Sequence, residues 1–343
     1  MDIPPSKIVE VLVTIPFDET LMAQIREVSP RVRLNTVTAR RPEDISPDLL
    51  QRAEVLYTDR VLPAPERVPN LKWVQFHYAG VDFALDSALL RKPGLVATTL
   101  SGAAAPQAAE FAITMMLALG RRLWDLRASQ EKCEWPRDRW ERFQPVELRG
   151  STVGLVGYGS IGRELARMLQ AFQVTVLAAK RDVMHIHDDG YLAQGLGDPN
   201  GDLFTRLYPI QALRSMLKIC DFVVVSLPLT TATRGLFGAD EFAAMKSSAY
   251  LVDLGRGGVV DHAALLAALQ EKRIGGAALD VFPEEPLPPT SPLWKMPNVM
   301  ITPHIAGISP LYNKRAIDLF TTNLQRYLDG SPVLNIVNLE KGY

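Results

Sequence analysis

The stretch "GLVGYGSIG" (154–162) decides the fold class of this chain. It leads from an apolar run into a helical pattern, and Gly157, Gly159 and Gly162 are spaced as G-x-G-x-x-G. At such a junction the first glycine allows a tight turn, the second a close approach to a pyrophosphate, and the third close helix–strand packing. The N-terminus of the helix adds amide donors for the anion. The stretch therefore predicts a dinucleotide site, with a plain strand-to-helix turn as the alternative.

Six short apolar runs from residue 152 onward predict strands of one sheet. They are "TVGLVG" (152–157), "VTVLAA" (174–179), "DFVVVSL" (221–227), "AYLVDLG" (249–255), "GAALDVF" (276–282) and "VMITPH" (299–304). Helical patterns fall between most of them, at 160–172, 209–219 and 261–272. This alternation predicts a doubly wound parallel sheet, which binds its ligands outside the carboxyl ends of the strands.

A similar alternating series precedes residue 100. Its apolar runs are 7–15, 54–58, 72–76 and 95–99, with helical patterns at 18–28 and 47–53. A long apolar helix (105–126) and a polar surface linker (128–150) are expected to follow. The tail, 311–338, has the pattern of an amphipathic helix ending at Gly330, and we expect it to pack back on the first domain.

The composition is that of an ordinary globular protein. The 343 residues are 47% hydrophobic and 22% charged, and the length suggests about two domains. A net charge of −1 gives no reason to expect nucleic acid or a membrane as partner, and no apolar run reaches the roughly 18 residues of a membrane span. The start, "MDIPPSKIVEVLV", lacks the pattern of a signal peptide, and Cys133 and Cys220 lack metal or disulfide spacing. We therefore expect a cytoplasmic protein.

Three polar residues stand at the carboxyl ends of the later runs. Arg256 follows "YLVDLG", Glu285 lies just beyond "ALDVF" with Glu284 as a rival, and His304 ends "VMITPH". An arginine can hold a carboxylate through paired hydrogen bonds, and a histidine beside a carboxylate can move a proton near neutral pH. Together they suit hydride transfer at a 2-keto or 2-hydroxy acid. Alternatively, each is an ordinary surface or core residue.

Five ordered motifs carry a family resemblance that covers about residues 54–335. They are "GLVGYGSIGRELA", "CDFVVVSLPLTTATRGLFG" (220–238), "LVDLGRGGVVDHAAL" (251–265), "AALDVFPEEPLP" (277–288) and "ITPHIAG" (301–307). The chain resembles the D-isomer-specific 2-hydroxyacid dehydrogenases, of the glyoxylate/hydroxypyruvate reductase kind. The resemblance implies an α/β fold of two doubly wound parallel-sheet domains. A Rossmann NAD(P)-binding domain (105–306) would be inserted in a flavodoxin-like substrate-binding domain (1–104 and 307–343).

The resemblance also implies roles for the three strand-end residues. His304 would be the acid in reduction, Glu285 rather than Glu284 would keep it protonated, and Arg256 would hold the substrate carboxylate. The enzyme would use NADP or NAD, act on a small acid such as glyoxylate or hydroxypyruvate, and form a homodimer. The expected cofactor-binding residues are Gly157, Gly159, Ser160, Ile161, Gly162, Lys180, Arg181, Leu227, Pro228, Thr233, Leu254 and Asp280. The expected substrate-binding residues are His77, Tyr78, Gly80, Val81 and Arg256; His77 and Tyr78 could instead be packing residues.

Two departures from the family pattern and two other activities stay open. Asp253 stands where the family commonly has asparagine, and Ser226 where it often has histidine. Formate dehydrogenases carry glutamine in place of Glu285, which argues against that activity. A phosphite dehydrogenase or a cofactor-sensing corepressor-like binding protein would keep the same three residues, so neither is excluded by them.

The end of the second strand bears on the choice of cofactor. NAD-selecting members commonly place an acid 18 residues after the third glycine, and here that position is Lys180, in "LAAKRD" (177–182). Lys180 and Arg181 would attract the 2′-phosphate of NADP, whereas Asp182 is a rival that could reach a ribose hydroxyl. We therefore expect NADP to be preferred and NAD to be possible. The loop that follows, 182–208, is expected to form a rim or lid and to bind no metal, although His185, His187, Asp188 and Asp189 could mimic ligands.

Overall fold

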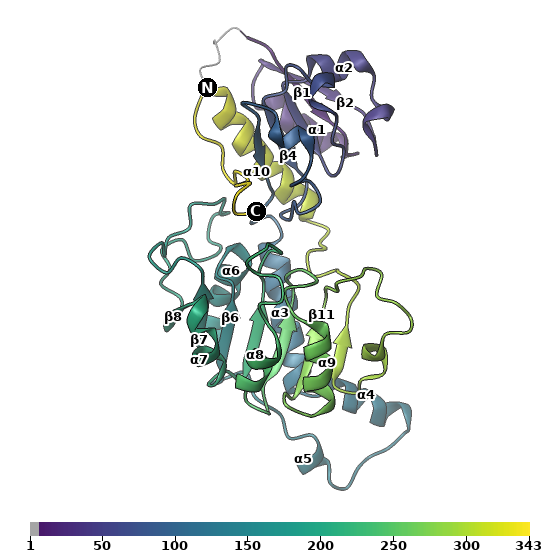
Figure 1. Ribbon diagram of the computed structural model, residues 1–343, viewed down its shortest axis with the longest axis vertical. Helices are drawn as coiled ribbons and strands as arrows, with labels where there is room; N and C mark the ends of the chain where they lie inside the picture. The colour runs from purple at the N-terminus through teal and green to yellow at the C-terminus, as the bar shows by residue number, and fades with distance from the viewer. Residues whose placement is uncertain (1–6) are drawn as a thin grey trace. The chain divides into compact units, whose positions relative to one another are not determined.

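The computed structural model describes residues 7–343, which divide into two compact units (Figure 1). Unit 1 comprises the chain up to Ala104, the short segment Asp189–Tyr191, and Ser309–Tyr343. Unit 2 comprises Ala105–Asp188 and Leu192–Ile308, and so is inserted within unit 1 along the chain. The first six residues lie outside the described residues. They belong to the stretch "MDIPPSKIVEVLV", in which we expect no signal peptide.

Unit 1 is built on a five-stranded parallel sheet in the order β2-β1-β3-β4-β5, the flavodoxin-like order. The strands are β1 Val9–Val13, β2 Val32–Thr36, β3 Val55–Thr58, β4 Trp73–Phe76 and β5 Val96–Thr98. The helices are α1 Glu19–Glu27, α2 Pro47–Arg52 and the C-terminal α10 Tyr312–Leu328, with short 3₁₀ turns at Pro42–Asp44, Pro65–Arg67 and Ala88–Arg91. β2 was not among the expected strands, because "VRLNT" is an edge strand that needs only partial burial.

The tail helix α10 packs on the sheet of unit 1, as Figure 1 shows for the yellow helix beside β1 and β4. Its buried face, which includes Phe320 and Leu324, shares one core with Val11 and Trp73. The Trp73 and Phe320 rings have centroids 5.3 Å apart. These apolar positions recur at helical spacing, so the face that the amphipathic pattern predicts to be buried is the face that packs on the sheet.

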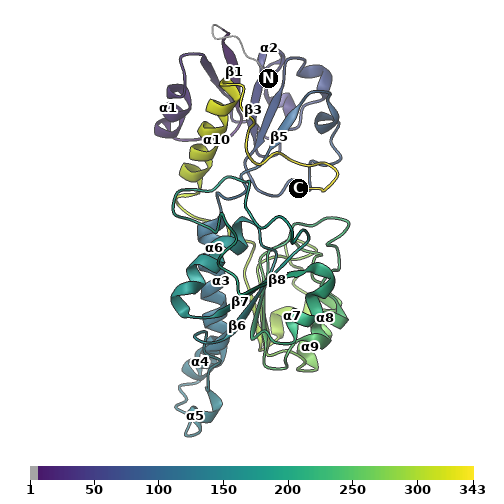
Figure 2. The same cartoon turned by 90° about the vertical axis from the view of Figure 1, so that its left-hand side faces the viewer.

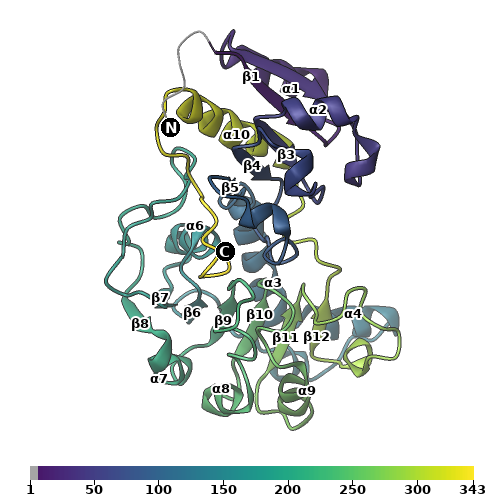
Figure 3. The ribbon, with the colours of Figure 1, turned by 45° about the horizontal axis from the view of Figure 1, so that its top comes forward.

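Unit 2 is built on a seven-stranded parallel sheet in the order β12-β11-β10-β9-β6-β7-β8 (Figure 3). The strands are β6 Thr152–Val156, β7 Thr175–Lys180, β8 Arg206–Pro209, β9 Phe222–Val225, β10 Tyr250–Asp253, β11 Gly276–Leu279 and β12 Val299–Ile301. Counted from β6, this is the Rossmann order with one further strand, and the chain reverses direction across the sheet between β6 and β9. The fold prediction is confirmed: two doubly wound parallel sheets, one unit inserted in the other.

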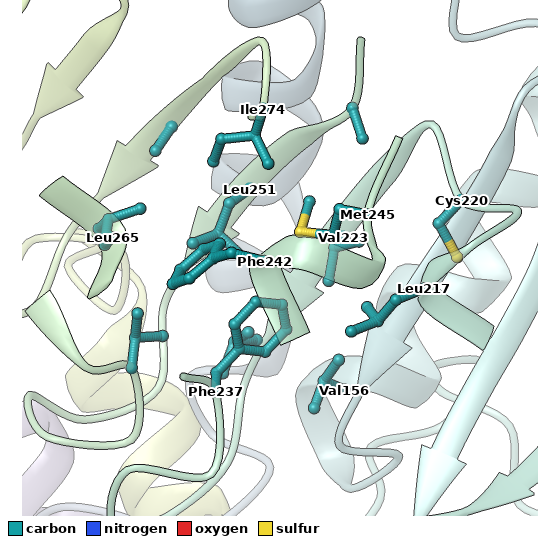
Figure 4. Packing of buried hydrophobic residues seen from close by; sticks show 14 of the residues in the cluster. Val156, Leu217, Cys220, Val223, Phe237, Phe242, Met245, Leu251, Leu265 and Ile274 are labelled. Atoms are coloured by element: carbon teal, nitrogen blue, oxygen red, sulfur yellow. The ribbon is translucent and has the colours of Figure 1, made fainter. Parts of the chain in front are cut away.

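Helices cover both faces of this sheet (Figure 2). On one face lie α3 Ala105–Gly120 and α6 Ser160–Leu169, which continues as a 3₁₀ turn at Gln170–Phe172. On the other lie α7 Leu213–Leu217, which follows a 3₁₀ turn at Ile210–Ala212, α8 Ala239–Ala244 and α9 His262–Gln270. Figure 4 shows part of the second core, where Phe237 and Phe242 pack near Leu251 and Val223.

Two connections differ from the expected ones. The helix expected over 105–126 ends at Gly120, and Arg122 has a left-handed backbone (φ 53°) before α4 Leu123–Glu131 begins. The break is fixed because Val146 donates its N–H to the Gly120 carbonyl (3.0 Å), so that the chain folds against the helix end. The expected linker also contains α5 Arg139–Arg142.

The second difference is in the segment 182–208, which ends in strand β8 rather than remaining a loop throughout. β8 extends the sheet beside β7, so this segment is in part a crossover within the sheet. A last 3₁₀ turn, Pro292–Lys295, precedes β12. Within residues 7–343, no helix combines the length and the apolar character needed to cross a lipid bilayer.

Candidate functional site

The glycine turn connects β6 to α6 and forms a tight cradle. Gly157 has φ 109°, a value that side-chain-bearing residues rarely adopt. A Cβ at Gly162 would lie 2.3 Å from the Gly157 carbonyl oxygen, so only glycine lets the helix come this close to the turn. A Cβ at Gly159 would meet no atom within 4 Å. Ser160 and Ile161 open α6, so their N–H groups are among the donors at the helix N-terminus, and the cradle fits a pyrophosphate.

The loop after β9 lies beside this turn. The Ser226 hydroxyl donates to the Gly157 carbonyl oxygen (3.4 Å), and Gly157 lies against the side chain of Leu227. Thr233 closes the loop, because its hydroxyl donates to the Pro228 carbonyl (2.6 Å). The expected cofactor-binding residues of β6 and β9 are therefore neighbours at the point where the strand order reverses.

Three strand ends of unit 2 carry the expected catalytic residues. His304 follows β12 and Glu285 follows β11, and His304 Nδ1 lies 2.9 Å from Glu285 Oε2. Glu285 Oε1 accepts the N–H of Phe282 (3.0 Å), which fixes the carboxylate from its own loop. Arg256 follows β10, is half-buried, and donates from Nη1 to the Gly255 carbonyl (2.9 Å). The structure therefore brings Glu285, rather than Glu284, to the histidine.

Asp280 is buried and accepts hydrogen bonds from the segment that carries His304. Its Oδ1 accepts the Thr302 hydroxyl (2.7 Å) and the Ile305 N–H (2.8 Å), and its Oδ2 accepts the Ala306 N–H (2.9 Å). His304 itself has a left-handed backbone (φ 53°), which a non-glycine residue adopts only where its surroundings impose it. The hydrogen bonds of Asp280 on either side of His304 supply that constraint.

Gly257 joins the arginine loop to the loop that carries Glu285. A Cβ at this position would lie 1.8 Å from the Phe282 carbonyl oxygen and 2.6 Å from the Pro283 nitrogen. Both are backbone atoms that cannot rotate away. The two loops therefore fix each other, and through them Arg256 is placed relative to Glu285.

Asp253 ends β10 and is fully buried. Its Oδ1 accepts the Gly255 N–H (3.1 Å), whereas Oδ2 has no hydrogen-bond partner among the described residues. Burial raises the pKa of the Asp253 carboxyl to about 7, the Gly255 N–H offsets part of that shift, and the charge of Asp280 adds to it. Leu254, which follows, is also buried.

The end of β7 leads into a turn that is held by hydrogen bonds among its own residues. The Lys180 ammonium donates to the His185 carbonyl, while Asp182 Oδ1 accepts the N–H groups of Met184 (3.0 Å) and His185 (3.3 Å). The Asp182 Oδ2 lies 2.9 Å from His185 Nδ1. These hydrogen bonds, above all the one from His185, lower the pKa of Asp182. The rival acid is therefore bonded within its own turn, and Arg181 is exposed beside it.

The segment after this turn is anchored on α6 through buried polar groups. Arg163 donates to the carbonyls of Asp198 and Ile186, and Tyr158 donates to Asp198 Oδ2 (2.6 Å). Asp198 also accepts the N–H groups of 201 (3.0 Å), 202 (2.9 Å) and 203 (3.0 Å). Although burial opposes it, these donors hold the pKa of Asp198 below its usual value. Glu164 accepts the Gly197 N–H (2.6 Å), so this part of the segment is held against α6.

In unit 1 the expected substrate-binding residues follow β4. His77 is buried among aromatic rings, its Nδ1 lies 2.8 Å from the Tyr57 hydroxyl, and burial lowers its pKa to about 4. Tyr312 of α10 donates its hydroxyl to the His77 carbonyl (2.6 Å). Tyr78 is exposed, while the side chain of Val81 is buried. The histidine side chain is thus a packing group that supports the loop after β4.

Taken together, the fold and the geometry of unit 2 define a dinucleotide-binding oxidoreductase of the dehydrogenase class. The family model "D-isomer specific 2-hydroxyacid dehydrogenase, NAD binding domain" matches residues 113–306. The chain belongs to this NAD(P)-dependent enzyme family, as the sequence motifs indicated.

Relatives and solved structures agree with this assignment. The chain is 35% identical to a glyoxylate reductase of Thermofilum pendens over 288 residues, which cover 83% of this chain and 80% of the relative. It is 29% identical to a D-3-phosphoglycerate dehydrogenase of Methanocaldococcus jannaschii, covering 96% of this chain but only 60% of that protein's length. It is similar to the structure of an NADPH-dependent glyoxylate/hydroxypyruvate reductase of Sinorhizobium meliloti in complex with NADP and sulfate. The TM-score is 0.75 at 28% identity, over 98% of this chain and 100% of that one.

Sequence reasoning missed two contributors to the site: Thr302, two residues before His304, binds Asp280, and Gly257 sets the loop contact. It noted Asp253 only as a departure from the family pattern, and not as a buried carboxyl whose Oδ2 has no hydrogen-bond partner among the described residues. Gly257 and Thr302 lie in the "RGG" and "TPH" motifs, but only the long-range contacts of the folded chain reveal which residues they touch. Within residues 7–343, no group of three or more His, Cys, Asp or Glu side chains is arranged to hold a metal ion.

Proposed function

We propose that this protein reduces a small 2-keto acid, such as glyoxylate or hydroxypyruvate, to the D-2-hydroxy acid, with NADPH favoured over NADH. The observation that carries the proposal is the His304–Glu285 pair (2.9 Å) at the strand edge that also presents Arg256. Such a set combines a proton donor, an anion beside it and a carboxylate-binding cation. The substrate is proposed by analogy with the glyoxylate and hydroxypyruvate reductases to which the chain is similar.

Each residue of the proposed site has its own role in the reduction. The Glu285 carboxylate, bonded to Nδ1, orients the His304 ring and stabilises its protonated form, so that Nε2 delivers the proton to the substrate oxygen. Arg256 binds the substrate carboxylate and polarises the carbonyl. In unit 1, the N–H groups of Gly80 and Val81 receive the carboxylate, Tyr78 lines the pocket, and His77 supports the loop. The nicotinamide cofactor supplies the hydride when bound.

The cofactor rests on the glycine turn, Ser160 and Ile161, with Leu227, Pro228, Thr233, Leu254 and Asp280 lining its site. Lys180 and Arg181 contact the 2′-phosphate of NADP, because Asp182 is bonded to His185 and its neighbours and so is held within its own turn. NAD binds more weakly, through the same cradle. The anchored segment after residue 182 forms a rim for the adenosine end.

A steady-state comparison of NADPH and NADH over a panel of 2-keto acids tests the proposal. We expect kcat/KM to be higher with NADPH, and Lys180→Asp with Arg181→Ser to shift the ratio toward NADH by about 10-fold or more. Higher kcat/KM with NADH in the wild type would contradict the cofactor preference. No turnover with any 2-keto acid, but NAD(P) reduction by phosphite, would replace the substrate class.

We propose a homodimer in the cytoplasm. The segment α4–α5 exposes Trp135 and Trp140, large apolar side chains that are 84% and 74% exposed. Covering such side chains favours association with a second copy. Both cysteines are free thiols, which suits a reducing compartment. The mass from light scattering tests the dimer.

A further inference from the structure

Two buried acidic residues, Asp253 and Asp280, stand at the carboxyl ends of β10 and β11, neighbouring strands that Figure 3 shows side by side. Asp253 is 0% and Asp280 is 1% exposed, and the Asp280 N–H donates to the Asp253 carbonyl (3.0 Å). A negative charge out of water is costly unless enough hydrogen-bond donors surround it, so a buried carboxyl with few donors is expected to hold a proton.

The hydrogen bonds of the two carboxyl groups differ. Asp280 accepts one hydroxyl and two backbone N–H groups. Asp253 accepts only the Gly255 N–H, and its second oxygen has no partner among the described residues. An ionised carboxylate with one donor is poorly solvated in this position, whereas a neutral carboxyl has the shape and the hydrogen-bonding capacity of an amide.

We propose that Asp253 is a positioning residue that works as a neutral carboxylic acid. It carries a proton near neutral pH and accepts the Gly255 N–H at the start of the loop that presents Arg256. When it ionises, the buried charge has only this one donor, which destabilises the turn, so that the hold of Arg256 on the substrate weakens as the pH rises. The effect on activity rests on the proposed function, while the state of the proton does not.

The electrostatic environment agrees with this assignment. Besides burial, the charge of Asp280, at the end of the neighbouring strand, adds to the rise in the pKa of Asp253, and the next charged side chain along its own loop is Arg256. Burial, the largest cause, raises the pKa of Asp253 to about 7, far above its usual 3.8. An acid whose pKa is raised by folding binds a proton more tightly in the folded protein, so this group stabilises the fold less as the pH rises from about 4 to 7.

Thermal unfolding of the apo protein tests the proton directly. Asp253→Asn keeps the shape of the side chain but cannot ionise. The Tm of this variant minus the Tm of the wild type should therefore increase by on the order of 5 °C between pH 5 and pH 8. Asp198→Asn is the matched control: Asp198 is equally inside the unit but ionised over this whole range, so its Tm difference should stay constant. A constant difference for Asp253→Asn would overturn the proposal.

Two further readouts separate the proton from a purely structural role. Infrared difference spectra at pH 6 should contain the carbonyl stretch of a protonated carboxyl in the wild type and lack it in Asp253→Asn; its absence from the wild type would overturn the assignment. In steady state, KM for the 2-keto acid should rise several-fold above pH 7 in the wild type and less in Asp253→Asn. If KM depends on pH equally in the wild type and in Asp253→Asn, Asp253 does not act on the substrate through Arg256. Inactivity of both proteins on all 2-keto acids would refute the proposed function and leave the unfolding and infrared results intact.

Discussion

Gly257→Ala should damage the site although the change adds a single methyl group. The new Cβ would lie 1.8 Å from the Phe282 carbonyl oxygen and 2.1 Å from its carbon, so the two loops have to separate by about 1.5 Å to reach ordinary contact. That separation moves Arg256 away from the loop that holds Glu285. Misplacement of this size costs about 100-fold in rate, and overpacking destabilises by about 1–3 kcal/mol.

The assay is kcat/KM for NADPH oxidation with the best 2-keto acid, alongside urea unfolding of the same preparations. The loss should appear in both kcat and KM, because both the acid and the carboxylate-binding groups shift. Gly238→Ala, at the start of α8, is the control: its φ is −114° and the nearest side-chain contact of its Cβ is at 3.7 Å, so its activity should stay near wild type. Wild-type kcat/KM in Gly257→Ala would refute the reasoning that the loops fix each other.

Three further changes probe the acid, the rim and the unit 1 core. Glu285→Gln removes the charge beside His304 and should lower kcat for reduction by about 100-fold in a NADPH-oxidation assay, whereas an equal loss in Glu284→Gln would contradict the assignment of the partner. Asp198→Ala leaves Tyr158 and three backbone N–H groups without their acceptor, and should cost about 1–3 kcal/mol of unfolding free energy in urea at pH 7; no change would mean that the rim is not anchored there. Burial lowers the pKa of His77 from 6.5 to about 4, so the unfolded chain binds more protons between these values and stability falls as the pH drops through this window. His77→Gln should remove up to about 3 kcal/mol of that pH dependence, measured as urea unfolding at pH 4 and pH 7, and an unchanged slope would refute it.

Local patterns were enough to predict much of this protein. The glycine spacing at 157–162, the alternation of apolar runs with helical patterns, and the polar residues at strand ends all act within one turn, one strand or one βα unit. That is why the two parallel sheets could be predicted from the residues, whereas the insertion of one unit in the other was implied by the family resemblance. The edge strands β2 and β8 were missed because their sequences, "VRLNT" and "RLYP", need little apolar character at a sheet edge.

The tertiary structure decided what each polar residue touches. Spacing alone does not separate Glu284 from Glu285; the family resemblance pointed to Glu285, and the path of the chain after β11 places its carboxylate on His304. In the same way, the tertiary structure places His77 among aromatic rings, bonds Asp182 to His185, and buries the Asp253 carboxyl. The physical reason is that periodicity and turn chemistry are local, whereas burial and the partners of a charged group depend on residues far apart in the sequence.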